Sequence, residues 1–217
     1  MIQVLAIVEG DTEEQFVSKV LGPALNGEAF HITPINWHGI KKYGRAKREL
    51  VQYVKTGPHI ITTMFDYYGL PLDWPGRSEA RSKAHGENVT HVERELLADI
   101  AGDDFVLQRK FIPYIQYHEF ETLLFCAPTV VARRIGDEAK AGRLQAVVDE
   151  FHGDVERIND DPATHPSARL AKIFPGYQKP LHGRMAVEAM GFSVLRDGCP
   201  HFGGWLLKLQ SLADASL

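Results

Sequence analysis

Acidic residues stand at the ends of three strand-like apolar segments of this chain: Glu9, Asp66 and Glu119. Glu13 lies one helical turn beyond Glu9, and Glu121 follows shortly after Glu119. The carboxyl ends of parallel strands share the sheet edge where open α/β proteins bind ligands, so these acids are expected to converge. Clustered carboxylates repel unless their pKa values rise or a divalent cation neutralises them. Carboxylate oxygens suit Mg²⁺ or Mn²⁺, so the acids indicate metal-assisted phosphodiester hydrolysis.

Taken singly, each acid also has an ordinary structural explanation. Glu9 is able to cap the helix expected after it, or to pair with a surface arginine. His118 beside Glu119 is not part of a zinc motif, because the second histidine of HExxH is missing; it orients a neighbouring carboxylate or packs. The chain has neither GxxxxGK[ST] nor GxSxG, which argues against a P-loop hydrolase and a serine hydrolase.

The segments that must position these acids predict an α/β fold. Residues 2–8 and 59–66 are rich in Val, Ile and Thr, which is typical of strands buried in a parallel sheet. Residues 105–117 are expected to form a third strand, and residues 30–37 a weaker one nearer the sheet edge. Helices are expected over residues 13–25, 41–54, 90–100, 136–151, 167–174 and 184–190 and at the C-terminus, with a long loop over 69–88.

The length of 217 residues predicts one compact domain. Within it we expect an α/β core over residues 1–126, which holds most of the acids, and a mainly helical part over 127–217 packed on that core. No apolar run approaches the ~20 residues that cross a bilayer, and no signal peptide is visible. Cys126 and Cys199 form no CxxC pair, so a cytoplasmic protein with both thiols reduced is expected.

The charge distribution leaves room for a local nucleic-acid contact. A net charge of −4 argues against a protein that simply coats nucleic acid. The run KKYGRAKR holds Lys41, Lys42 and Arg45 at the start of an expected helix. Such a run either meets phosphates or is a solvated helix face.

Several motifs, in order along the chain, resemble the DUF4276 family. Residues 9–13 read EGDTE after an apolar strand, residues 65–71 read FDYYGLP, and residues 116–121 read QYHEFE. The later matches are PSAR at 166–169, GYQK at 176–179 with His182 and Gly183, and CPHF at 199–202 with Trp205. The resemblance covers nearly the whole chain, and several separate motifs make it specific. That family is similar to a branch of the Toprim-fold proteins, related to the nuclease domains of OLD (overcoming lysogenisation defect) enzymes.

The resemblance implies a Toprim or Rossmann-like core, a mostly parallel sheet flanked by helices, with a helical C-terminal extension. It also implies Mg²⁺ or Mn²⁺ bound by acids at the strand ends, which correspond here to Glu9, Glu13, Asp66, Glu119 and Glu121. The general Toprim pattern has Asp-x-Asp at the second motif, whereas this chain has Tyr68 at the third position. That departure leaves the choice between one and two metals open, and Asp73 is a weak substitute because it lies in a loop.

The resemblance further implies a basic residue near the scissile phosphate. Lys179 is the first candidate and Arg169 the second. The ordinary alternatives are an exposed lysine at a helix start and an arginine paired with an acid of the fold. His182 lies one turn beyond Lys179 and is a further phosphate-binding candidate.

We therefore expect an Mg²⁺- or Mn²⁺-dependent nuclease that acts on DNA in preference to RNA. The resemblance implies a separately encoded AAA- or ABC-type ATPase as partner, in bacterial defence against phage; a homodimer is compatible with the sequence, and no membrane contact is expected. The alternative, motivated by Tyr68, is an inactive Toprim-like module that binds or regulates the ATPase. A phosphotransferase with an aspartyl nucleophile ranks last, because the segment after Asp66 lacks the second Asp.

Overall fold

The chain forms two compact units in the computed structural model, which describes residues 1–158, 161 and 163–214. Unit 1 comprises Met1–Gln116 and the C-terminal residues from Ser211, and unit 2 comprises Tyr117–Gln210. The boundary expected after residue 126 lies within unit 2. Within the described part of the chain, no helix combines the length and the apolar character needed to span a membrane.

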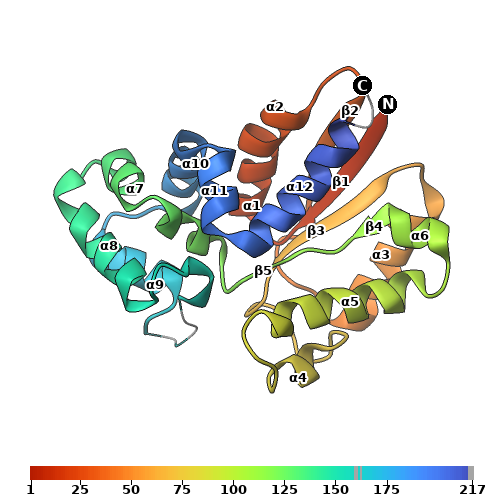
Figure 1. Ribbon diagram of the computed structural model, residues 1–217. Coiled ribbons are helices and arrows are strands. Elements are labelled where there is room, and N and C mark those ends of the chain that lie inside the picture. The colour runs from red at the N-terminus through yellow and green to blue at the C-terminus, as the bar shows by residue number, and fades with distance from the viewer. Residues whose placement is uncertain (159–160, 162, 215–217) are drawn as a thin grey trace. The chain divides into compact units, whose positions relative to one another are not determined.

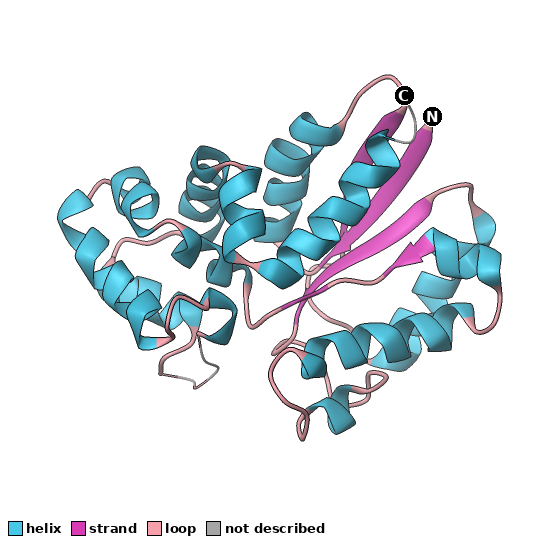
Figure 2. Ribbon diagram, in the orientation of Figure 1, coloured by secondary structure: helices cyan, strands magenta, loops and turns pink. Residues whose placement is uncertain are grey.

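Unit 1 is built on a parallel sheet of five strands (Figures 1 and 2). The central strand β1 pairs in parallel with β2 on one side and with β3 on the other, so the carboxyl ends of β1 and β3 are neighbours. The first four strands have the order β2-β1-β3-β4, and β5 pairs with the end of β3. The strands are β1 (Ile2–Val8), β2 (Phe30–Asn36), β3 (Ile60–Asp66), β4 (Phe111–Ile112) and β5 (Ile115–Gln116).

The interior of the sheet explains the β-branched composition of β3. Ile61, Met64 and Phe65 are fully buried, and so are the two threonines of the strand. The Thr62 hydroxyl donates a hydrogen bond to the backbone oxygen of Ile112 at 2.7 Å, and the Thr63 hydroxyl donates to that of Tyr114 at 2.9 Å. Because both buried hydroxyls are satisfied, these threonines fix β3 to the β4–β5 segment without a desolvation penalty.

Helices cover both faces of this sheet. The connection from β1 to β2 and the connection from β2 to β3 cross the sheet in opposite directions. Right-handed crossovers therefore place the α1–η1–α2 segment on one face and α3 on the other, where α3 contacts α5 and α6 (Figure 1). The helical segments of unit 1 are α1 (Asp11–Phe16), the π-helical η1 (Val17–Leu21), α2 (Gly22–Leu25), α3 (Tyr43–Thr56), α4 (Arg77–Ala80), α5 (Glu87–Ala101) and α6 (Phe105–Lys110).

The prediction of a third strand over residues 105–117 is wrong for the first half of this segment. Residues 105–110 form helix α6, because the side chain of Asp104 accepts hydrogen bonds from the N–H groups of Val106 and Leu107 at 2.9 and 3.2 Å. This N-cap satisfies the free donors of the first turn and starts a helix in an apolar segment. Only the short strands β4 and β5 remain, separated by a segment that contains Pro113.

Glu119 consequently does not end a strand. It follows β5 after two intervening residues and is the N-cap residue of the 3-10 helix η2 (Phe120–Cys126). His118 before it adopts φ 58°, a left-handed conformation that turns the chain between the strand and η2. The turn, and not the end of a strand, sets the direction of this carboxylate.

The described residues of unit 2 form helices and connections but no strand (Figure 2). The centre of the unit is η2, whose residues from Phe120 to Phe125 are all buried and which contacts α7, α9, α10 and α11. The surrounding elements are α7 (Pro128–Ile135), η3 (Glu138–Lys140), α8 (Ala141–Glu150), η4 (Val155–Arg157), α9 (Pro166–Ile173), α10 (Lys179–Met190), α11 (Phe192–Gly198) and α12 (Pro200–Asp214), whose residues from Ser211 belong to unit 1. The predicted α/β class, with a mostly parallel sheet and helices toward the C-terminus, is confirmed.

Candidate functional site

The ends of β1 and β3 bring Glu9 and Asp66 together in unit 1. Glu9 directly follows β1, and Asp66 is the last residue of the neighbouring strand. The backbone N–H of Asp66 donates to Oε2 of Glu9 at 3.3 Å, and both residues are half-buried. The hydrogen bond across the strand ends holds the Glu9 carboxylate over the sheet edge, as the sequence predicted for these two acids.

Glu13 lies in the first turn of α1 and is only 6% exposed. Its Oε2 accepts a hydrogen bond from the backbone N–H of Gly10, the N-cap residue, at 3.1 Å. This is the reciprocal half of a capping box, and it closes the turn that joins β1 to α1. The Glu13 carboxylate therefore has a structural task in addition to the metal-binding role predicted for it.

Gly69 provides the space that the Glu9 carboxylate occupies. A Cβ atom at this position would lie 3.1 and 3.2 Å from the two oxygens of Glu9, and 3.4 Å from the backbone oxygen of Asp66. The two separations from Glu9 are closer than ordinary van der Waals contacts. A glycine after Asp66-Tyr67-Tyr68 therefore lets the chain turn close to the carboxylate.

Gly69→Ala is expected to displace the Glu9 carboxylate. If Glu9 binds Mn²⁺ as the sequence predicts, the variant should bind the ion about 10-fold more weakly, as changes beside a metal ligand do. Isothermal titration calorimetry with Mn²⁺ measures the effect. Gly44→Ala in α3 is the matched control, since a Cβ there meets nothing within 4 Å. Equal Mn²⁺ affinity in the two variants would contradict this role of Gly69.

The segment after Asp66, expected as a long loop, contains the short helix α4, whose first residue is a buried cation that the sequence did not single out. Arg77 is only 7% exposed, and its guanidinium carbon lies 4.0 Å from the centre of the Tyr67 ring. This cation–π contact places a positive charge beside the residue that follows Asp66. Nothing in the sequence distinguishes Arg77 from the other basic residues of the segment.

Tyr68 and Asp73 are the two residues that bear on the number of metal ions, and their surroundings differ. Tyr68 is 36% exposed, and its ring meets the Tyr67 ring edge-on at 5.6 Å between centroids. Asp73 accepts a hydrogen bond from the backbone N–H of Tyr43 at 3.0 Å, which caps the start of α3. Asp73 therefore has a structural role, in line with its weak standing as a substitute ligand.

The predicted phosphate-binding run at the start of α3 is largely neutralised within unit 1. Glu49 forms ion pairs with both Lys41 and Arg45, and Lys41 also lies 4.3 Å from the centre of the Trp37 ring. Lys42 is the N-cap residue of α3 and is exposed. These pairs favour the solvated-face interpretation for Lys41 and Arg45, and Lys42 is exposed beside them.

Glu119 is held in unit 2 by the start of α9. Its Oε2 accepts hydrogen bonds from the backbone N–H of Ser167 at 2.9 Å and pairs with Nδ1 of His165 at 3.0 Å. The Ser167 hydroxyl donates to Oε1 at 3.0 Å. Burial raises the pKa of Glu119, but the charge of Lys179 and these hydrogen bonds outweigh it, so the pKa lies below its usual value. Glu119 is therefore a fixed anion.

Glu121 lies close to Glu119 and has the opposite character. Its side chain is 1% exposed, Oε2 accepts a hydrogen bond from Nζ of Lys179 at 3.2 Å, and Oε1 faces the Tyr177 hydroxyl at 3.4 Å. Nζ of Lys179 is also 3.6 Å from Oε1 of Glu119, so one ammonium group serves both carboxylates. Burial is the main reason that the pKa of Glu121 is raised, and the charge of Glu119 adds to it.

The raised pKa of Glu121 predicts a pH-dependent cost in stability. Above pH 4.5 the folded protein retains the Glu121 proton, whereas the unfolded chain has released it. Proton binding at Glu121 therefore stabilises the folded state fully below pH 4.5. This contribution to the free energy of unfolding is lost as the pH rises through the pKa of Glu121 in the folded protein. Glu121→Gln removes the titration. The stability of the variant relative to wild type is expected to increase with pH in that window, with a slope of up to about 1.4 kcal/mol per pH unit.

Urea unfolding of both proteins at a series of pH values measures this difference. Glu119→Gln provides a comparison of opposite sign. Because the pKa of Glu119 is lowered in the folded protein, its ionised form stabilises the fold at pH values above the ordinary glutamate pKa, and this stabilisation is lost as the pH falls. Parallel stability curves for wild type and Glu121→Gln would show that the pKa of Glu121 is the same in the folded protein and in the unfolded chain.

The two remaining phosphate-binding candidates have structural partners in unit 2. Arg169 donates from Nε to the backbone oxygen of Thr164 at 2.6 Å and pairs with Glu150 at 2.8 Å. Its side chain is only 15% exposed, so its pairing with an acid of the fold, the predicted alternative, is observed. Nδ1 of His182 accepts the backbone N–H of Gln178 at 2.8 Å, which caps the start of α10.

Three residues that contact Glu119 or Glu121 were not predicted from the sequence: His165, Ser167 and Tyr177. PSAR and GYQK drew attention to the segments that contain Ser167 and Tyr177, but the spacing did not show that these two residues contact Glu119 and Glu121. His118 faces elsewhere, with Nε2 at 2.9 Å from the backbone oxygen of Glu156. Packing with a satisfied ring nitrogen accounts for His118.

The predicted metal ligands fit a hard divalent cation in kind, because all of them are carboxylates. As placed, however, no group of three or more His, Cys, Asp or Glu residues within 1–158, 161 and 163–214 is arranged to hold a metal ion. Glu13 accepts a hydrogen bond from Gly10, and Glu119 accepts one from Ser167. Such bonds orient a carboxylate and leave lone pairs for a metal ion. The sharing of one ion by the acids of units 1 and 2 stays a prediction.

Comparison with known proteins places the chain in a family but reveals no activity. The family model described as a domain of unknown function, DUF4276, matches residues 8–210. The matched span includes every acid of the two clusters, from Glu9 to Glu121, and the basic residue Lys179. No curated protein and no solved structure matches the chain.

Proposed function

Because the chain belongs to the DUF4276 family, whose description assigns no activity, we propose its function from the acidic clusters: a divalent-metal-dependent nuclease. The observation that carries the proposal is the meeting of Glu9 and Asp66 at the carboxyl ends of neighbouring parallel strands. That edge is where open α/β sheets bind their ligands. Two acidic residues at one sheet edge form a site that a divalent cation can occupy, because the cation neutralises the repulsion of nearby carboxylates.

In this proposal, Glu9, Glu13 and Asp66 are the residues of unit 1 that would hold Mg²⁺ or Mn²⁺. A bound ion of this kind polarises a phosphoryl oxygen and lowers the pKa of water. The Asp66 N–H fixes the Glu9 carboxylate, and Gly69 leaves room for it. The Glu9 carboxylate is therefore held in place before it binds the metal ion. Glu119 and Glu121 are proposed as further ligands.

Lys179 is the residue we propose to steady negative charge on the phosphate. Its side chain is 46% exposed, while its ammonium group is held by Glu121 and Glu119 at 3.2 and 3.6 Å. The two contacts fix the direction of a long flexible side chain and leave part of it accessible to substrate. A preorganised cation of this kind stabilises charge that develops during phosphodiester cleavage.

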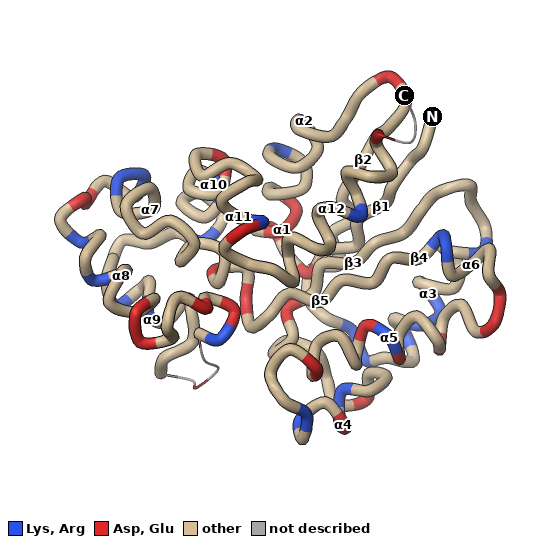
Figure 3. Tube along the Cα trace, viewed as in Figure 1, with Lys and Arg blue, Asp and Glu red and all other residues tan. Residues whose placement is uncertain are grey.

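DNA is the proposed substrate in preference to RNA, and binding is expected to be local. Charges of both signs occur along α3 and α5 (Figure 3), and the net charge is −4. Exposed Lys42 at the start of α3 is a phosphate contact consistent with that distribution. Kinship with Toprim-fold and OLD-type nucleases, and an AAA- or ABC-type ATPase partner in phage defence, rest on the motif resemblance and are proposed on that ground.

The test is cleavage by the purified full chain of supercoiled plasmid, single-stranded DNA and RNA, each with Mg²⁺, Mn²⁺ or excess EDTA. We expect Mn²⁺- or Mg²⁺-dependent cleavage of DNA that EDTA abolishes. Cleavage that continues at the same rate in EDTA would contradict a metal-dependent mechanism.

A second candidate function is an inactive module that binds or regulates an ATPase. Two observations favour it: Lys179 already forms ion pairs with Glu119 and Glu121, and exposed Tyr68 stands where the general pattern has an acid. Calorimetry separates the candidates, because an inactive module takes up no Mn²⁺ at the Glu9–Asp66 edge. Specific uptake that Asp66→Asn removes supports the nuclease.

A further inference from the structure

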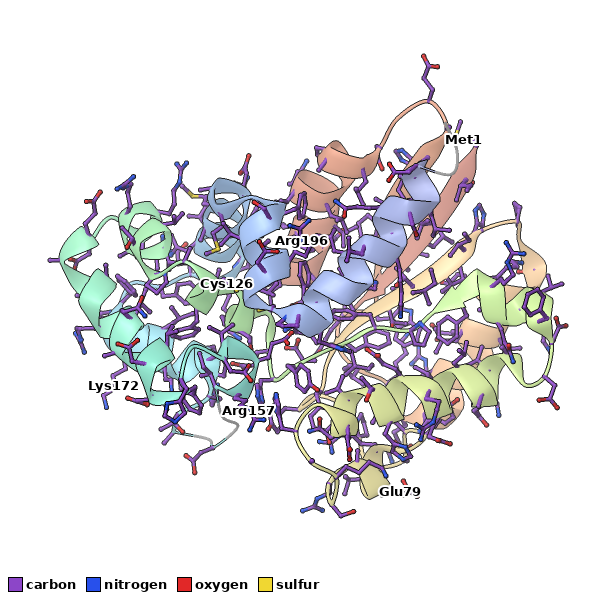
Figure 4. All side chains as sticks on the ribbon, viewed as in Figure 1. Met1, Glu79, Cys126, Arg157, Lys172 and Arg196 are labelled. Atoms are coloured by element: carbon purple, nitrogen blue, oxygen red, sulfur yellow. The ribbon has the colours of Figure 1, made fainter. Side chains whose placement is uncertain are left out.

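The two cysteines of the chain, far apart in sequence, meet in unit 2. Cys126 is the last residue of η2, and Cys199 directly precedes α12 (Figure 4 labels Cys126). Their sulfur atoms lie 3.2 Å apart, and both are free thiols. The sequence showed two isolated cysteines without a CxxC motif, and only the fold brings them into contact.

Gly198 makes this contact possible. A Cβ atom at position 198 would lie 2.8 Å from the sulfur of Cys126 and 3.0 Å from its Cβ. Real side chains do not adopt such separations, so any larger residue would push Cys126 away from the neighbouring cysteine. The backbone at Gly198 is thus shaped to receive the Cys126 side chain.

The two thiols differ in access to solvent. Cys126 is half-buried, whereas Cys199 is 0% exposed. Burial, followed by the hydrogen bond with Cys126, raises the pKa of the Cys199 thiol. A small oxidant in solution can therefore reach Cys126, while Cys199 is positioned to react with the sulfur of Cys126.

We propose that Cys126 and Cys199 form a reversible oxidation site for hydrogen peroxide, in which Cys126 is attacked first and Cys199 resolves the product. The Cys126 thiolate attacks one peroxide oxygen and the O–O bond breaks, so that Cys126 becomes a sulfenic acid. The hydroxide that leaves takes up the proton released by the Cys126 thiol, which gives one water. The Cys199 sulfur then bonds to the Cys126 sulfur. The S–O bond breaks, and the hydroxyl leaves with the Cys199 proton as a second water.

The geometry requires little movement for the second step. A disulfide has its sulfurs about 2.05 Å apart, so the pair must close by about 1 Å. Cys126 ends one helical segment and Cys199 precedes another, so both lie where the backbone can adjust. A dithiol such as dithiothreitol reverses the reaction by thiol–disulfide exchange, in which its two sulfurs are oxidised and both cysteines reduced.

The experiment treats the full chain with hydrogen peroxide and follows free thiols, intact mass and thermal unfolding. We expect the monomer to lose both thiols and the mass of two hydrogen atoms, and to unfold at a higher temperature until dithiothreitol restores the reduced form. Because the sequence holds two cysteines in all, the intact mass identifies the product. A disulfide between two chains, or a mass gain of two oxygens on Cys126 with Cys199 still reduced, would overturn the proposal.

Variants test the order of the two steps. Cys199→Ser is expected to accumulate a dimedone-reactive sulfenic acid on Cys126, while Cys126→Ser should leave Cys199 unmodified by the same treatment. Gly198→Ala keeps both thiols and is expected to slow disulfide formation about 10-fold or more through the displaced sulfur. Gly204→Ala is its control, since a Cβ there has no neighbour within 4 Å. Disulfide formation at the wild-type rate in Gly198→Ala would contradict the proposed geometry.

Discussion

Glu9→Gln is expected to lower metal-dependent cleavage about 100-fold or more, because loss of a ligand exceeds the effect of changing its neighbours. Glutamine retains an oxygen that accepts the Asp66 N–H, so the turn at the end of β1 should persist. What it removes is the negative charge. Plasmid cleavage at saturating Mn²⁺, together with urea unfolding, separates the two effects, and the free energy of unfolding is expected to change by less than about 1 kcal/mol.

Asp11→Asn is the matched control for this experiment. Asp11 lies in the first turn of α1, close to Glu9 in sequence, but its side chain is 71% exposed. The substitution removes the same charge, and asparagine keeps the side-chain oxygen that accepts a hydrogen bond from Asn36 at the end of β2. Equal cleavage by Glu9→Gln and Asp11→Asn would show that the end of β1 does not carry the reaction.

Lys179→Met is expected to lower cleavage by about 100- to 1,000-fold, as removal of one preorganised charge-stabilising group does. The effect on stability is expected to be small, because the side chain is nearly half exposed and solvent screens its ion pairs. Glu121, whose pKa is already raised by burial, can remain protonated without the ammonium group. The fall should therefore lie in kcat, measured with a fluorescent oligonucleotide substrate.

Lys172→Met in α9 controls for loss of a surface charge in the same unit, since Lys172 is exposed (labelled in Figure 4). Lys179→Arg keeps the positive charge and is expected to retain part of the activity. If Lys179→Met cleaves as fast as Lys172→Met, Lys179 serves only to neutralise Glu119 and Glu121.

The meeting of Glu9 and Asp66 in unit 1 was predictable because its signals are local. Strands β1 and β3 are short runs of apolar and β-branched residues, and each stops at a carboxylate that packing does not explain. Parallel pairing of the two strands then brings Glu9 and Asp66 together without further information. Gly69 lies three residues after Asp66, but the sequence does not show that the fold places it against the Glu9 carboxylate.

The arrangement of unit 2 was not predictable in the same way, because its partners are distant in sequence. Ser167 and His165 reach Glu119 from the start of α9, and no periodicity links those positions. The strand expected over residues 105–117 failed for a local reason, since the cap at Asp104 outweighed the apolar pattern. That error also led to the view that Glu119 ends a strand.

The parallel pairing of β1 has a consequence for folding during synthesis of the chain. Both partners of β1 lie later in the chain, and each is reached through a helical crossover. A nascent chain that emerges from the ribosome therefore exposes an apolar strand with no hairpin neighbour to cover it until β2, and then β3, have been synthesised. Non-local pairing of this kind slows folding and favours aggregation. Expression at low temperature, or with a chaperone that shields the first strand, should raise the yield of folded protein.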